Sequence, residues 1–220
     1  MKKLYVLLDN GHGSNTPGKC SDLLPDGTRF REYSFCREVV DALYDRLLSY
    51  EQFVPIKITP ETTDISLGTR VNRINQYCKK YGASNCIMIS VHVNAAGNSG
   101  WMTGRGWSAW TTRGQNISDL LADCLYEGAD FVIGNNKEYV ESFKGQTKQK
   151  PIREDKSDKD RDWEANYQII RGSNCAAVLT ENFFMDNKKD VEYLLSARGL
   201  TDTINIHLKG IEIYYNRYKK

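Results

Sequence analysis

The sequence has no long apolar run, no marked excess of either charge and no paired cysteines. No apolar stretch approaches the roughly 20 residues that cross a membrane, so we expect no membrane span. The 220 residues carry 30 basic and 28 acidic side chains, a formal net charge of +2, without a basic cluster, which argues against a nucleic-acid partner. The six cysteines form no C-x-x-C pair, so neither a zinc ribbon nor a dense disulfide framework is expected. We expect most of them in the core, and Cys20 as an unligated loop thiol.

The first residues also lack the features of a signal peptide. Two lysines precede the apolar LYVLL, but Asp9 ends that run early and no small-residue cleavage site follows. We therefore expect residues 3–8 to form a strand, and the chain to be synthesised in the cytoplasm without a signal peptide. Because no repeat, low-complexity segment or linker interrupts the sequence, residues 1–220 are expected to form a single domain.

Apolar strands alternate with amphipathic helices along the chain. Further strands are predicted at residues 54–60, 86–94, 104–112 and 175–184. Helices are predicted from Glu32, before Gly82, around 117–125, and twice after the last strand. This alternation predicts an α/β fold: a three-layer domain with a twisted, mostly parallel sheet flanked by helices.

Four polar residues stand where such a fold places binding sites. His12, His92 and Glu181 lie at the ends of predicted strands, and ligands bind at the carboxyl ends of strands in open α/β sheets. The loop before Glu32 would bring that residue to the same edge. Glycines on both sides of His12 free its backbone and leave room for a metal and a substrate.

Two histidines with one carboxylate are a common catalytic zinc set, and a further glutamate nearby could take a proton from water. Each residue also has a structural alternative, which for His12 is an ordinary turn between its two glycines. His92 shares a strand face with Ser90 and Asn94 and could be a hydrogen-bonded core histidine. Glu32 suits the first turn of any helix. Glu181 could form a buried ion pair with Arg171.

Other conspicuous residues predict structure first. Residues 144–161 have no apolar periodicity and predict a long solvated loop, with a substrate-covering flap as the alternative. Trp101, Trp107 and Trp110 are expected in the core, although they could stack on a sugar. His207 lies within the last helix and is expected to be structural.

Four separated motifs resemble a known family, the zinc-dependent N-acetylmuramoyl-L-alanine amidases of bacterial autolysins and phage endolysins. The stretches DNGHG, SLGTRVNRIN, SVHVNAAG and LTENFFMDN resemble the family's motifs in the family's order, and Glu32 matches its first-helix glutamate. The resemblance covers nearly the whole chain. Asn10 replaces the usual proline, and Asn182 and Phe183 stand where small residues are common.

The resemblance implies zinc bound by His12, Glu32 and His92, with Glu181 as the catalytic acid and base. It implies hydrolysis of the amide between N-acetylmuramic acid and L-alanine in peptidoglycan. We add three candidate substrate-binding residues: Asn94, Asn182 and Arg171. A monomer is expected that reaches the cell wall after the membrane is breached, as a phage or prophage enzyme would. A zinc peptidase and a non-catalytic wall-binding protein are the alternatives.

Overall fold

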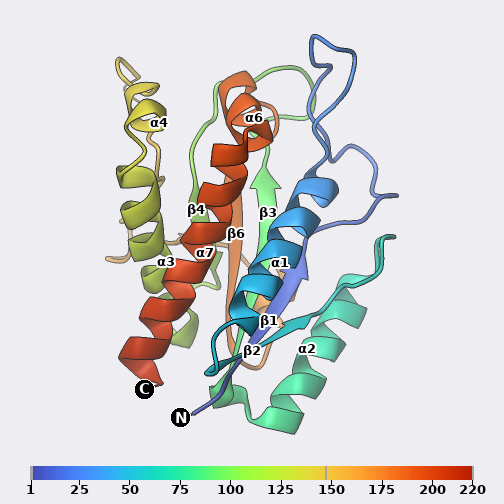
Figure 1. Ribbon diagram of the computed structural model, residues 1–220, viewed down its shortest axis with the longest axis vertical. Coiled ribbons are helices and arrows are strands. Elements are labelled where there is room, and N and C mark those ends of the chain that lie inside the picture. The colour runs from blue at the N-terminus through green and yellow to red at the C-terminus, as the bar shows by residue number, and fades with distance from the viewer. Residues whose placement is uncertain (1, 147, 220) are drawn as a thin grey trace.

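The computed structural model describes residues 2–146 and 148–219 as one sheet between two layers of helices (Figure 1). The strands are β1 (Leu4–Asn10), β2 (Phe53–Lys57), β3 (Cys86–Asn94), β4 (Ser108–Thr111), β5 (Trp163–Glu164) and β6 (Ala176–Phe184). The helices are α1 (Glu32–Leu48), α2 (Leu67–Tyr81), α3 (Ile117–Gly134), α4 (Lys137–Glu141), α5 (Gln168–Arg171), α6 (Lys188–Leu195) and α7 (Ala197–Tyr218), with a 3-10 turn at Ala83–Asn85. The predicted three-layer α/β architecture is confirmed.

The strands follow the order β2-β1-β3-β6-β4-β5 across the sheet. The first four strands in this order are parallel, as predicted for most of the sheet. β4 runs antiparallel to β6, and β5 runs parallel to β4, so these two strands are reversed. The segment between β3 and β4 contains no helix that would bring the chain back to the start of the sheet, and β4 therefore enters from the opposite end.

Alternation along the strands separates two apolar cores. Leu4, Val6 and Leu8 point to the face that α1, α3 and α7 cover, and Leu7 points to the face with α2 and α5. Figure 1 shows α1 and α7 lying across the first face, with α2 beside the edge strand β2. Fewer helices cover the second face.

Most local predictions agree with the structure. The strand at 86–94 and the helix beginning at Glu32 are confirmed, whereas β2 and β4 are shorter than predicted and β5, α4 and α5 were not predicted. Residues 144–161 hold no helix or strand in their described part, except that Ile152 makes a bridge to Trp107. No helix among the described residues has both the length and the apolarity to cross a membrane.

Several residues expected in the core are confirmed there. Five of the six cysteines are buried as free thiols, and Cys20 is partly exposed. Trp107 is fully buried. His207 is buried between the Thr180 hydroxyl, 2.9 Å from its Nε2, and the Thr203 carbonyl, 2.7 Å from its Nδ1. Burial lowers the pKa of His207 to about 4, so this histidine is neutral and structural.

Candidate active site

The four polar residues predicted at the strand ends lie together at one edge of the sheet. His12 follows β1, Glu32 opens α1, and His92 and Glu181 are register partners on the parallel strands β3 and β6. Side chains of register partners point to the same face, so the His92 ring and the Glu181 carboxylate are neighbours. The edge predicted from the parallel strands is therefore the edge observed.

His12, Glu32 and His92 form a compact set of metal donors. One ligand atom from each lies within 4.8 Å of the others. Among the described residues, no other group of three or more histidines, cysteines or acidic residues could hold a metal ion in this way. Glu32 Oε1 lies 3.0 Å from His92 Nδ1 and accepts a 3.0 Å hydrogen bond from the Val93 amide. Glu32 Oε2 lies 3.4 Å from His12 Nε2.

A cation suits this donor set because one oxygen of Glu32 is otherwise unsatisfied. Glu32 is 1% exposed, and within the described structure its Oε2 is buried without a hydrogen-bond donor. A buried carboxylate oxygen without a partner is costly, and a metal ion would remove that cost. Two imidazoles and one carboxylate are the donor types that zinc takes in catalytic sites.

The protonation states of His12 and Glu32 fit metal binding. Burial lowers the pKa of His12 to about 4, against the opposing charge of Glu32, so its imidazole is neutral at pH 7. Burial alone would lower the pKa of His92, but the hydrogen bond and charge of Glu32 outweigh it and raise that pKa. Burial would raise the pKa of Glu32, but His92 and His12 outweigh it and lower that pKa. Glu32 is thus ionised and ready to bind a cation.

Glu181 differs from Glu32 in its electrostatic surroundings. Its Oε2 is buried and lacks a hydrogen-bond partner among the described residues. Burial raises the pKa of Glu181 to about 8, His92 opposes that shift, and the negative charge of Glu32 adds to it. A carboxyl group with a pKa near neutrality can both accept and deliver a proton, which is the requirement for general acid–base chemistry.

The glycines beside His12 leave room for protein groups. A methyl group on Gly11 would lie 2.2 Å from Cε1 of the His92 ring, and one on Gly13 would lie 2.0 Å from the backbone nitrogen of Asp64. The left-handed φ of 64° falls on His12 itself. The expectation that these glycines leave room for a metal and a substrate was therefore wrong in part. They leave room for the His92 ring beside Gly11 and for the backbone of Asp64 beside Gly13.

Arg70 and Asp9 form a buried ion pair behind His12 that the sequence analysis did not identify. Arg70 Nη1 lies 2.7 Å from Asp9 Oδ1, and both side chains are almost fully buried. The Arg70 guanidinium also donates to the carbonyls of Asn10 and His12, and Asp9 accepts from the Ser90 hydroxyl. The pair thus holds the DNGHG loop against α2. Arg70, the first arginine of SLGTRVNRIN, was the sequence feature from which this ion pair could have been suspected.

The three candidate substrate-binding residues have different surroundings. Asn182 is fully buried; its amide donates to the His92 carbonyl and accepts from Trp107 Nε1. The prediction that Asn182 binds substrate is therefore wrong, because its polar atoms link strands within the core. Asn94 is partly exposed at the end of β3, and its role stays a prediction. Arg171 is exposed, and no ion pair joins it to Glu181 in the described structure; its role also stays a prediction.

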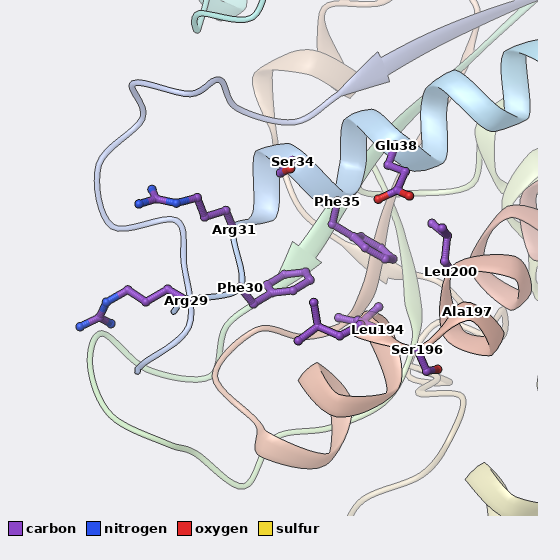
Figure 2. Close-up of a pocket in the computed structure, with 11 residues that line it drawn as sticks. Arg29, Phe30, Arg31, Ser34, Phe35, Glu38, Leu194, Ser196, Ala197 and Leu200 are labelled. Carbon is purple, nitrogen blue, oxygen red and sulfur yellow. The ribbon is translucent and has the colours of Figure 1, made fainter. Parts of the chain in front are cut away.

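A cavity of about 460 Å³ lies beside the metal donors. It is lined by His12 and His92 with residues of the β1 end and of α2. Another cavity, of about 470 Å³, lies on the opposite face between α1 and the α6–α7 junction, where Figure 2 shows Phe35 and Leu200. Neither Glu181 nor any of the three donors lines that second cavity. The first cavity is therefore the one of these two that adjoins the candidate site, through His12 and His92.

An α/β domain that gathers two imidazoles and a carboxylate beside a further carboxylate has the parts of a metal-dependent hydrolase. Comparison with known proteins identifies which one. The chain belongs to the N-acetylmuramoyl-L-alanine amidase family, whose pattern matches residues 6–213. It is therefore an enzyme that hydrolyses the bond between N-acetylmuramic acid and L-alanine in peptidoglycan.

Similar proteins agree with this assignment. The chain is 30% identical over 224 aligned positions to the endolysin of Bacillus phage SPP1, covering 100% of this chain and 69% of that one. It is 25% identical over 220 residues to the N-acetylmuramoyl-L-alanine amidase CwlM of Bacillus licheniformis, covering 97% of this chain and 70% of that one. The crystal structure of the amidase from Clostridium difficile 630 shares the fold, with a TM-score of 0.74, 19% identity and 99% of both chains covered.

Proposed function

We propose that this amidase uses zinc held by His12, Glu32 and His92, and that Glu181 is its general base and general acid. The observation that carries the proposal is the convergence of the three donors within 4.8 Å beside Glu181, the register partner of His92. Neutral His12, ionised Glu32 and the unsatisfied Glu32 Oε2 support a cation there.

Zinc supplies Lewis acidity when bound, which polarises the scissile carbonyl and lowers the pKa of the attacking water. Glu181 accepts the proton of that water and then delivers it to the amine of L-alanine as the amide breaks. Burial raises the pKa of Glu181 toward neutrality, so its carboxylate can take a proton from water and hold it until the amine leaves. The Val93 amide keeps Glu32 oriented toward the two histidines.

A digest of purified peptidoglycan tests the metal and the cleaved bond together. Free stem peptides that begin with L-alanine, detected by mass spectrometry, are expected from the untreated enzyme. A chelator should abolish them and added zinc should restore them. Shortened stems still attached to sugar would contradict the assignment of the bond, and full activity after complete metal removal would contradict the role of zinc.

Glu181→Gln tests the proton-transfer role. The substitution keeps the size of the side chain, so zinc content and melting temperature should stay close to those of the wild type, while turnover falls about 100-fold or more. Glu192→Gln is the matched control, because Glu192 is exposed on α6 and outside the site. A Glu181→Gln enzyme with wild-type turnover would refute the role.

We also propose that the enzyme acts as a monomer and reaches the wall once the membrane is breached. All four site residues come from one chain, so the site needs no partner subunit. The similarity to a phage endolysin supports release through a breached membrane. Light scattering after size-exclusion chromatography tests the first statement. Lysis of expressing cells only after membrane permeabilisation tests the second.

A further inference from the structure

Arg153 carries a guanidinium group on the same face of the sheet as the catalytic carboxylate Glu181. Its Cζ lies 5.0 Å from the ring centre of Phe184, three residues after Glu181 on β6. The same atom lies 5.1 Å from the ring centre of Trp163 on β5. Two aromatic rings thus hold the cation in place through cation–π contacts.

The backbone of Arg153 is anchored next to the strand that pairs with Glu181. Its amide donates a 2.8 Å hydrogen bond to the carbonyl of Trp107, and its carbonyl accepts a 2.9 Å hydrogen bond from the Tyr126 hydroxyl. Trp107 directly precedes Ser108, the register partner of Glu181. This part of the 144–161 segment is therefore built onto the edge of the site.

The charge of Arg153 has no carboxylate partner within the described structure. Arg70, Arg105 and Arg161 each form at least one ion pair with an acidic side chain, whereas none involves Arg153. Its guanidinium also makes no hydrogen bond to the described residues, although it is partly buried. Burial lowers the pKa of Arg153, and its charge in turn lowers that of Glu181. A guanidinium group carries five N–H donors in a rigid planar arrangement, which suits an anion that accepts two hydrogen bonds at once, such as a carboxylate.

We propose that Arg153 binds a carboxylate of the peptide stem and thereby places the scissile amide beside Glu181. The inference rests on the proposed function of Glu181. The N-acetylated sugars of peptidoglycan are uncharged, whereas its peptide stems carry free carboxylates, which are the groups that an arginine fork recognises best. Two sources are available on one stem: the α-carboxylate of the second residue and the carboxylate at the stem end.

Three soluble muropeptides distinguish these sources. One has all carboxylates free, the second has an amide in place of the second-residue α-carboxylate, and the third has an amide at the stem end. The wild-type enzyme should lose about tenfold in kcat/KM on one of the two amidated substrates, the effect of one charge-assisted contact. Arg153→Met, which keeps an unbranched side chain between the rings, should cleave all three at similar rates.

The kinetics of Arg153→Met distinguish a role in substrate binding from a role in folding or in the chemical step. Arg153→Met should raise KM on the free muropeptide with kcat, zinc content and melting temperature near wild-type values. Arg113→Gln, at an exposed arginine of the β4–α3 loop, is the control and should keep the wild-type preference. An unchanged preference in Arg153→Met, or an equal loss on all three substrates, would overturn the inference. If the wild type released no peptide from any of them, the proposed function itself would fail.

Discussion

Replacing Gly11 by alanine would place a methyl group against the His92 ring. The methyl carbon would lie 2.2, 2.4 and 2.5 Å from Cε1, Nδ1 and Nε2 of that ring. The ring must retreat by about 1 Å or more to regain van der Waals contact. His92 Nδ1 lies 3.0 Å from Glu32 Oε1, so this retreat breaks the geometry of the donor set. We expect Gly11→Ala to lose zinc and at least about 100-fold in activity.

The matched control is Gly134→Ala, the same substitution where no atom lies within 4 Å of the added methyl group. It should keep zinc and activity and gain up to about 1 kcal/mol of stability, because alanine is the better helix former. Zinc content after dialysis, peptidoglycan hydrolysis and thermal unfolding are measured for both variants. A Gly11→Ala protein with one zinc per chain and wild-type hydrolysis would refute the argument that Gly11 makes room for His92.

Two further predictions concern stability. Arg70→Met leaves the Asp9 carboxylate buried without its partner and should lower the free energy of unfolding by about 3–5 kcal/mol in urea denaturation, whereas Arg113→Met should change it little. A loss as small as that of the control would contradict a structural ion pair. Burial, with the charge of Asp160 adding to it, raises the pKa of Asp162 to about 7. Because the folded-state pKa lies above the unfolded one, ionisation costs stability as pH rises from about 4 to 7. Asp162→Asn should therefore gain stability relative to the wild type between pH 5 and pH 8; a constant difference would exclude this titration.

The site was largely predictable because its residues mark strand and helix ends. His12, His92 and Glu181 follow apolar runs, and the ends of parallel strands meet at one edge of the sheet. Glu32 was open to a structural interpretation, since any first helical turn favours an acidic residue. Its buried and unsatisfied Oε2 is the observation that separates it from an ordinary helix-start glutamate.

The errors share one cause: they concern contacts between segments that are distant in the chain. Asn182 follows Glu181 and was predicted to bind substrate, yet strand alternation turns it into the other face, where Trp107 Nε1 donates a hydrogen bond to its side-chain oxygen. The reversal of β4 could not be predicted from its composition, because a strand of four residues is too short to show the pattern that distinguishes parallel from antiparallel strands.

The sequence by itself determined the α/β class, the elements that carry the site and the four polar residues that meet there. These features follow from local periodicity and from motifs whose residues lie close together along the chain. Only the tertiary structure decided that Gly11 makes room for His92, that Arg70 pairs with Asp9, and that the Arg153 guanidinium lies over the Phe184 ring, three residues after Glu181. Each of these facts is a distance between atoms brought together by packing, and local sequence patterns do not encode such distances.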